Sequence, residues 1–464
     1  MLRRQRRLPI RLPDVFILEQ NDQWYPPVFF ILCALIPEGW LKKYYWLVNH
    51  LIDLTHVTIL FVSAVVMGRL WLGACVIVLY AMLPSLVLEY ANLSTRPLGV
   101  LLFSAFLLSA HVGWSHPAWI AGAAIFGAAL LYSHKLSSQQ LWFTLPMLAM
   151  ATGLWGWLLW LPGIYLLSFL IWPRGFKRIL QGHRAIVSFW YRYWPLLGAH
   201  MVRQSPVYGD GKTRTDYYAV DGWPGLIRFA KDTLHQNYFV APVLVAAMVN
   251  PPSDPLGVFL ITWIASVYVW AFLIHVIRGM RGIGLGGQYI KFAHMPTFLY
   301  LISFGPSFPL WIWAITLLCL TLCVRQYSLV SRNLRNVFSD QSGRISAELE
   351  AILDRLKREK GARVMCLPVH LCDLVAYLSR VPTYWGTHSH CFDEKLADFF
   401  PVLRRRIEDY AREDGLTHLI LDTDYVLPGE LGLDEHNSLE RQGRYLMFRI
   451  DAVGTASGAV LAQR

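Results

Sequence analysis

Long apolar runs separated by short polar turns dominate the first 330 residues of the 464-residue chain. Many of these runs approach the roughly 20 residues that an α-helix needs to cross a bilayer. They predict about ten membrane-spanning helices, at residues 45–66, 71–90, 98–113, 117–133, 140–153, 155–172, 238–250, 256–278, 291–304 and 307–324. The pattern therefore predicts a polytopic α-helical membrane protein.

Two segments differ from these runs. The apolar stretch "WYPPVFFILCALIPEGW", residues 24–40, is bracketed by Pro26, Pro27 and Pro37. It predicts a helix that lies in the membrane interface, with a true span as the alternative. Residues 173–237 are basic and aromatic, which predicts a long amphipathic or re-entrant loop between spans.

The pattern changes again after residue 325. Strand-like "ARVMCLPV" and "LTHLILDTDYV" alternate with helix-like segments such as "KLADFFPVLRRRIEDYARE", and this alternation predicts a soluble α/β domain with a mainly parallel sheet. We therefore expect three regions: an interfacial first-loop segment at 1–44, a transmembrane domain at 45–325 and a soluble domain at 326–464.

Composition supports the membrane interpretation. The chain is 55% hydrophobic and only 16% charged, whereas soluble domains carry roughly 25% charged residues. Many of the 19 Trp residues stand at the ends of apolar runs, as an interfacial aromatic belt requires. The net charge of +11 lies on no nucleic-acid-binding motif, so we expect no nucleic-acid partner. It fits topology signals, anionic headgroups or a phosphate-bearing substrate.

The run "LLYSHKLSSQQLWF" interrupts two apolar stretches with Ser133, His134 and Lys135, followed by further polar residues up to Gln140. Such a polar segment must lie at a membrane face. Several other cations also stand at the ends of apolar runs, and a cationic, aromatic-lined concavity there suits a lipid-linked phosphate. The candidate phosphate or headgroup contacts are Arg96, His134, Lys135, Arg174, Lys177, Arg178 and Arg184. For each residue taken alone, a snorkelling or topology role is the favoured interpretation, and only their shared placement indicates a phosphate site.

Acidic residues also stand in these regions: Asp14, Glu19, Asp22 and Glu89.

Two further clusters have competing interpretations. His50, Asp53 and His56 lie within the first long span, where an ionisable cluster could relay protons or ions, although snorkelling explains it equally well. A second cluster could bind zinc and comprises Cys366, His370, Cys372, His388, His390 and Cys391. Its spacing matches no common zinc pattern, so buried cysteines are the favoured interpretation and we expect no metal site there.

Six strings occur in the order found in one family: "RRLPIRLPDVFILEQNDQWYPPVFFILCALIP", "STRPLGVLLF", "LLYSHKLSSQQLWF", "GHRAIVSFWYRYW", "GLGGQYIKFAHMP" and "LILDTDYVLPGELGL". Through them the chain resembles prokaryotic integral-membrane glycosyltransferases of the GT-C superfamily. The resemblance implies a multi-pass protein of the prokaryotic inner membrane. It would transfer a sugar from a polyprenyl-phosphate donor to a glycan or lipid-linked acceptor, for cell-surface polysaccharide synthesis. The resemblance also implies a catalytic acidic residue, which acts as general base toward the acceptor hydroxyl or binds a divalent cation. The candidates for this role are Asp14, Glu19, Asp22 and Glu89.

The chain departs from this family at its start. Relatives have a first transmembrane helix and an acidic motif ahead of the "LP…YPP" segment, whereas Met1 falls inside that first loop. Either the true start lies upstream, or the family's catalytic acid is missing. An inactive partner subunit therefore remains an alternative, as does a transporter or flippase of lipid-linked saccharides.

The missing helix also decides the predicted orientation. With an extra first span, the basic face lies outside the cytoplasm, as in the family. Counted from Met1 alone, the excess of basic residues instead places that face inside.

Overall fold

The structure is a computed structural model. It describes residues 15–18, 25–90, 93–197, 222–339, 345–369, 371–386, 398–399, 403 and 405–450. The chain divides into two compact units, which are considered separately below. Unit 1 comprises residues 1–8, 24–191 and 221–336, and unit 2 comprises residues 9–23, 192–220 and 337–464.

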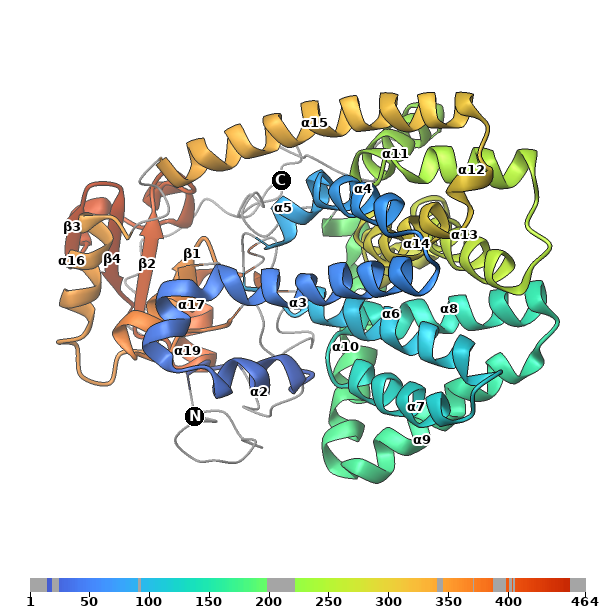
Figure 1. Ribbon diagram of the computed structural model, residues 1–464. Coiled ribbons are helices and arrows are strands. Elements are labelled where there is room, and N and C mark those ends of the chain that lie inside the picture. Colours follow the sequence, from blue (N-terminus) through green and yellow to red (C-terminus); the bar gives the residue numbers. More distant parts are fainter. Residues whose placement is uncertain are drawn as a thin grey trace. The chain divides into compact units, whose positions relative to one another are not determined.

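Unit 1 is helical throughout its described part (Figure 1). Its first half contains α2 (Val28–Leu35), α3 (Glu38–Val66), α4 (Leu70–Ala81), α5 (Pro84–Tyr90), α6 (Arg96–Gly113), α7 (Ala118–Leu131), α8 (Lys135–Thr152), η1 (Trp155–Leu159), α9 (Trp160–Ile171) and α10 (Pro173–Leu197). Its second half contains α11 (Trp223–Gln236), α12 (Val240–Val249), α13 (Pro255–Val276), η3 (Arg278–Ile283), η4 (Gly286–Ala293), α14 (His294–Phe304), η5 (Gly305–Ser307) and α15 (Leu310–Ser339).

Four helices of the described part are long and apolar enough to cross a membrane: α3, α6, α13 and the first 24 residues of α15. Four shorter apolar helices lie at 70–81, 118–131, 155–171 and 240–249. The helical membrane architecture is thus as the sequence predicts, and the helices follow the predicted apolar runs closely. The number of bilayer crossings stays a prediction.

Two of the predicted spans are discontinuous. The run at 71–90 is divided into α4 and α5 by Met82 and Leu83, immediately before Pro84. Proline has no backbone N–H, so it cannot donate the helical hydrogen bond to a carbonyl of the preceding turn. The run around 291–304 begins as the 3₁₀ segment η4 and becomes α-helical only at His294. Both interruptions lie beside the cavity described below.

The centre of unit 1 is α13, which is apolar on all sides. Asp254 caps its first turn by accepting a hydrogen bond from the Gly257 N–H at 2.9 Å. The Trp263 ring is fully buried and lies edge-on to Phe103 of α6, with ring centroids 5.9 Å apart. A helix that is hydrophobic all round is typical of a core helix or of a membrane span, and α13 is one of the four candidate spans, with just over half of its apolar stretch buried.

The helix α10 is amphipathic. Its buried residues recur at helical spacing: Phe176, Ile179, Ile186 and Phe189. The opposite side exposes charged residues, including Lys177 and Arg184. This pattern is typical of a helix that lies along a membrane surface. The amphipathic or re-entrant loop at 173–237 stays a prediction, because residues 198–221 lie outside the described part of the chain.

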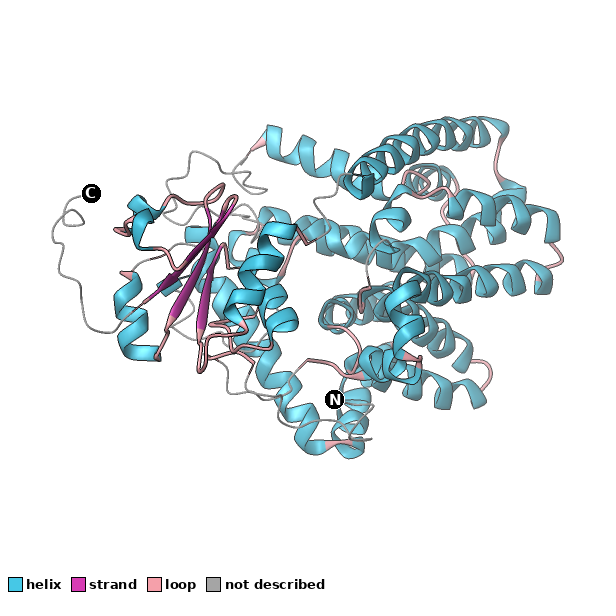
Figure 2. Ribbon diagram, turned by 90° about the vertical axis from the view of Figure 1, so that its left-hand side faces the viewer, coloured by secondary structure: helices cyan, strands magenta, loops and turns pink. Residues whose placement is uncertain are grey.

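Unit 2 contains a four-stranded sheet in the order β1-β2-β4-β3, shown in magenta in Figure 2. The strands are β1 (Val364–Leu367), β2 (His418–Asp422), β3 (Glu440–Gln442) and β4 (Tyr445–Arg449). Its helices are α16 (Ala347–Leu356), α17 (Leu371–Ser379) and α19 (Ile407–Asp414), with η7 (Pro428–Leu431) and η8 (Glu435–Asn437). Only β1 and β2 are parallel; β4 is antiparallel to both β2 and β3. The prediction of a mainly parallel sheet is therefore wrong, because β3 and β4 form a hairpin that adds antiparallel strands.

A short N-terminal segment belongs to unit 2. Phe16 forms a parallel bridge with Thr383, and the Thr383 N–H donates to the Val15 carbonyl at 2.8 Å. The Phe16 ring covers Gly386, where an added Cβ would lie 2.4 Å from the ring. Residues 15–18 are thus held by backbone pairing, whereas the sequence predicts an interfacial loop for the whole of 1–44.

Candidate functional site

The polar segment 133–140 is not an exposed loop: residues 132–134 form a tight turn after α7, and residues 135–140 are the first turns of α8. Several of its polar groups have partners inside unit 1. The Ser138 hydroxyl donates to the His134 carbonyl at 3.3 Å, and the Gln139 side chain accepts a hydrogen bond from the Tyr289 hydroxyl at 2.7 Å. Buried polar groups are normally paired in this way. The segment therefore joins α8 to η4 and presents His134 and Lys135 at the start of α8.

The first turns of α6 and α8 pack directly against each other. Gly99 permits this approach: a Cβ added there would lie 2.4 Å from Ser137 Oγ and 2.6 Å from His134 Cβ. His134 is 6% exposed, and its Nδ1 lies 3.4 Å from Ser137 Oγ. Any larger residue at position 99 would push the two helix N-termini apart.

This packing brings two cations together. Arg96 is the first residue of α6 and Lys135 is the first residue of α8, and each is half-buried. Both charges act on the His134 imidazole, and the Arg96 charge acts on Lys135. Helix N-termini carry a partial positive charge and unpaired N–H groups, which attract anions. Two such termini and two cations therefore form one electropositive site.

A histidine from α10 completes the group. Burial, together with the charge of Lys135, lowers the pKa of His183 to about 3, so its ring is neutral at physiological pH. Its Nε2 is buried and has no hydrogen-bond partner among the described residues. His183 thus offers an unpaired polar atom close to Lys135, and the sequence analysis did not select it.

The segment before α2 closes another side of the site. The Tyr25 hydroxyl lies 3.1 Å from Thr95 Oγ1, next to Arg96, and the Val28 N–H donates to the Tyr132 carbonyl at 3.0 Å. We call the group formed by Tyr25, Arg96, His134, Lys135 and His183 the cation site.

The other predicted cations of α10 are placed differently. Arg174, Lys177 and Arg184 are exposed, and Arg178 is partly exposed. The structure thus places three of the four on the outer side of α10 instead of bringing the whole stretch into one cavity. Exposed cations on an amphipathic helix suit contact with anionic headgroups.

The four acidic candidates have side chains outside the described part of the chain. Asp14, Glu19 and Asp22 lie outside the described residues, and Glu89 lies in the last turn of α5, with its side chain outside the described part.

A second polar group lies inside unit 1. Asp53, which the sequence analysis noted within the first span, accepts a hydrogen bond from the Tyr80 hydroxyl and lies 3.4 Å from Nδ1 of His56. His50 is not part of this group, because it is exposed and its Nδ1 lies 2.8 Å from the Trp46 carbonyl.

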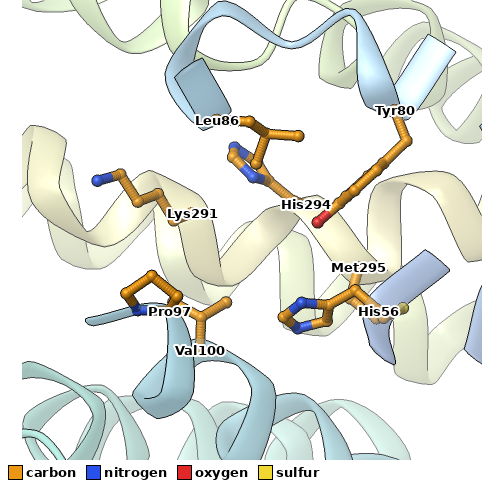
Figure 3. A pocket seen from close by; sticks show the side chains of 8 residues that line it. All are labelled: His56, Tyr80, Leu86, Pro97, Val100, Lys291, His294 and Met295. Atoms are coloured by element: carbon orange, nitrogen blue, oxygen red, sulfur yellow. The ribbon is translucent and has the colours of Figure 1, made fainter. Parts of the chain in front are cut away.

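His56 and Tyr80 line a cavity formed by α3, α4, α5, α6, η4 and α14 (Figure 3). The lining residues are His56, Tyr80, Leu86, Pro97, Val100, Lys291, His294 and Met295. Tyr80, Lys291 and His294 come from different segments, and no pattern along the chain predicts that they meet.

Among the described residues, no group of three or more His, Cys, Asp or Glu side chains is placed to hold a metal ion. Of the zinc candidates, Cys366 and Cys372 are buried in the core of unit 2. The remaining ones, His370, His388, His390 and Cys391, lie outside the described residues.

Comparison with known proteins adds no family assignment: no protein-family model matches the chain, and no curated protein matches it significantly.

Proposed function

We propose that the protein is a multi-pass glycosyltransferase of the prokaryotic inner membrane. It transfers a sugar from a polyprenyl-phosphate donor to a glycan or lipid-linked acceptor, for synthesis of cell-surface polysaccharides. Two lines of argument support this proposal. The GT-C resemblance supplies the reaction, and the cation site supplies a place for the donor phosphate.

The observation that carries the proposal is the convergence of Arg96 and Lys135 at two helix N-termini. Two like charges in partly buried positions repel each other, and this repulsion costs more as the local dielectric constant falls. A phosphate bound between the two cations would offset this repulsion. A phosphate accepts several charge-assisted hydrogen bonds at once, and each contributes about 1.5–3 kcal/mol.

The surroundings favour a lipid-linked phosphate over a soluble one. The cation site lies at the ends of helices in an apolar unit, and α10 beside it exposes Arg174, Lys177 and Arg184. A polyprenyl chain would remain in the bilayer, while its phosphate would reach the helix termini. An ordinary phospholipid headgroup shares this phosphate chemistry, so the experiment below includes both lipids.

The proposed reaction is a substitution at the anomeric carbon of the sugar. The acceptor oxygen forms a bond to this carbon and loses its proton to a base. The bond between the carbon and the phosphate oxygen breaks, and the electron pair leaves with polyprenyl phosphate. Arg96 and Lys135 would stabilise the negative charge that grows on the leaving phosphate.

One feature of the fold also suits a transporter of lipid-linked saccharides. The α4–α5 and η4–α14 segments are discontinuous, and broken helices surround the substrate sites of many transporters. The two functions differ in their products: a transporter moves the intact lipid-linked sugar, whereas a transferase releases polyprenyl phosphate.

The test uses purified protein in nanodiscs of neutral phosphatidylcholine. Binding of radiolabelled polyprenyl phosphate is measured in competition with phosphatidylglycerol and with inorganic phosphate. A panel of radiolabelled polyprenyl-phosphate hexoses and pentoses then reports loss of the sugar from its lipid. We expect polyprenyl phosphate to bind more tightly than phosphatidylglycerol, and at least one donor of the panel to be cleaved. Equal affinity for both lipids, without cleavage of any donor, would refute the proposal.

A further inference from the structure

The helix α10 carries positive charges and no negative ones. Its 25 residues contain the cations Arg174, Lys177, Arg178, Arg184 and Arg192, and they contain no aspartate or glutamate. A helix that faces water normally interleaves charges of both signs, which pair along its surface. The unbalanced charge of α10 therefore indicates that its surroundings supply the negative charge.

The exposed cations share one side of α10. Arg174, Lys177 and Arg184 are exposed, and so is Gln181 between them. Successive positions in this set are three or four residues apart, so all four lie on one side of the helix. The buried apolar residues described above occupy the opposite side, and part of them belongs to the hydrophobic core of unit 1. We call the outer side formed by Arg174, Lys177, Gln181 and Arg184 the cationic face.

The three cations of this face have no counter-charge in the described part of the chain. None of them forms an ion pair or a hydrogen bond with a described residue. Other exposed cations of unit 1 do: Lys42 Nζ lies 2.9 Å from a Glu38 carboxylate oxygen, and Arg228 Nε lies 3.9 Å from Asp232 Oδ2. The cationic face therefore remains available to an external anion.

The start of α10 lies at the end of an apolar helix. Residues 155–171 form one of the shorter apolar helices, and only Trp172 separates them from α10, which begins at Pro173 (Figure 1). Tryptophan concentrates where the hydrocarbon layer of a bilayer meets the headgroups. A helix that begins at this depth and exposes cations along one side suits the headgroup layer, where it meets lipid phosphates.

We propose that the cationic face is a docking surface for anionic phospholipids of the surrounding bilayer. The inference does not depend on the proposed function, because a transporter or an inactive subunit with the same helix would bind the same lipids. The cationic face differs from the cation site in that its side chains are exposed instead of packed between helix N-termini. Exposed side chains respond to charge and not to headgroup shape, so phosphatidylglycerol and phosphatidylserine should bind equally well.

The strength of this preference follows from the number of cations. Each Lys or Arg near a negatively charged membrane surface contributes about a fivefold preference. Three cations therefore set an upper limit of about a hundredfold. Salt screens exposed charges over a Debye length of about 10 Å at 0.1 M and about 3 Å at 1 M. The preference should thus be large at low ionic strength and small at high ionic strength.

The test uses the full chain in nanodiscs of phosphatidylcholine that contain a minor fraction of phosphatidylglycerol. A fluorescent amino acid replaces Gln181 on the cationic face, and lipids with a nitroxide close to the headgroup quench it. The ratio of quenching by labelled phosphatidylglycerol to quenching by labelled phosphatidylcholine gives the lipid preference beside α10. The control is the same fluorophore at His116, an exposed residue between α6 and α7, because the chain has no Lys or Arg between Arg96 and Lys135.

We expect phosphatidylglycerol to be preferred at position 181 by at least about fivefold at low ionic strength. Phosphatidylserine should give the same ratio, the preference should disappear near 1 M salt, and position 116 should show none. No preference at position 181, or one that salt does not weaken, would overturn the inference. This salt titration leaves all three cations in place, so it does not depend on the folding of a charge variant.

A triple variant then assigns the preference to the cationic face. Arg174→Gln, Lys177→Gln and Arg184→Gln together should reduce the ratio at position 181 to near one. The matched control removes three exposed cations of unit 2 and should keep the ratio; its changes are Arg358→Gln, Lys360→Gln and Arg406→Gln. Both variants lose the same net charge, so a ratio that persists in the α10 variant would overturn the inference.

The same nanodiscs separate this inference from the proposed function. An unmutated protein that prefers phosphatidylglycerol at position 181 but neither binds polyprenyl phosphate nor cleaves any donor would refute the proposed function and support the docking surface. Binding and cleavage of a donor without any lipid preference at position 181 would do the reverse.

Discussion

Replacing Gly99 by Ala should disrupt the cation site without removing any charge. The new methyl group would lie 2.4 Å from Ser137 Oγ and 2.6 Å from His134 Cβ, whereas carbon atoms make comfortable contacts at about 3.5–4 Å. Ser137 belongs to the first turn of α8, and His134 is the N-cap residue of this helix. The two helix termini must therefore separate by about 1 Å.

This separation has an electrostatic cost. Moving one unit charge from about 4 Å to about 5 Å from an anion loses about 0.8 kcal/mol at an effective dielectric constant of about 20. Complete loss of one charge-assisted hydrogen bond costs about 1.5–3 kcal/mol. The affinity for polyprenyl phosphate should thus fall by between about fourfold and about a hundredfold. Overpacking should also lower the free energy of unfolding by about 1–3 kcal/mol.

The matched control is Gly163→Ala in α9. An added Cβ at Gly163 meets no atom within 4 Å, so this change has the same chemistry without the clash. Lipid binding in nanodiscs and thermal unfolding in detergent are the assays. If Gly99→Ala binds polyprenyl phosphate as tightly as Gly163→Ala does, close packing of the two termini is not what forms the phosphate site.

Three further changes test separate parts of the structure. Lys135→Ala should weaken polyprenyl-phosphate binding by about tenfold to a hundredfold, while Lys231→Ala, which removes an exposed charge on α11, should leave the dissociation constant unchanged. Arg69→Ala should lower the free energy of unfolding by about 1.5–3 kcal/mol, measured by thermal denaturation, because its guanidinium donates to two carbonyls at the end of α14. Ile420→Ala should destabilise unit 2 by about 2–5 kcal/mol, measured by the protease sensitivity of that unit in the full chain, because Ile420 is fully buried in β2.

The contacts of Arg69 could not be predicted from the sequence. Along the chain, Arg69 is an isolated charge between two apolar runs. In the structure it joins the start of α4 to the end of α14, so it has a structural role. Isolation in sequence does not reveal a contact made with a segment more than 230 residues away.

The helices of unit 1 could be predicted closely because apolar runs of span length have few alternative structures. The interruptions between α4 and α5 and between η4 and α14 were harder to predict. Apolar composition continues across residues 82–84, so hydropathy alone joins α4 and α5, which the backbone separates. Pro84 is a local signal for the first break. The glycines at 282, 284, 286 and 287 precede the second, but their effect depends on the close approach of α10 and α13.

The cation site could be predicted in part. Arg96 and Lys135 stood out because a charge at the end of an apolar run is conspicuous. His183 did not stand out, because an amphipathic helix also contains histidines that face water. Its importance depends on its burial next to Lys135, and this contact is not visible in the sequence.

The sheet shows another limit. The β3–β4 hairpin turns at Gly443, which has a φ of 55°, and such left-handed conformations favour glycine. The string "RQGRY" was therefore a usable turn signal. What the sequence could not give is the position of β4 beside β2, which makes the sheet mixed instead of parallel.

The most direct test of the central claim is photolabelling with a polyprenyl phosphate that carries a photoreactive diazirine next to the phosphate. The protein is irradiated in phosphatidylcholine nanodiscs, and labelled residues are identified by mass spectrometry. We predict labels on the first turns of α6 and α8, at residues 96–100 and 134–139, with loss of labelling at both places in Lys135→Ala. Labels confined to the outer surface of α15, unchanged in Lys135→Ala, would contradict a phosphate site at these helix termini.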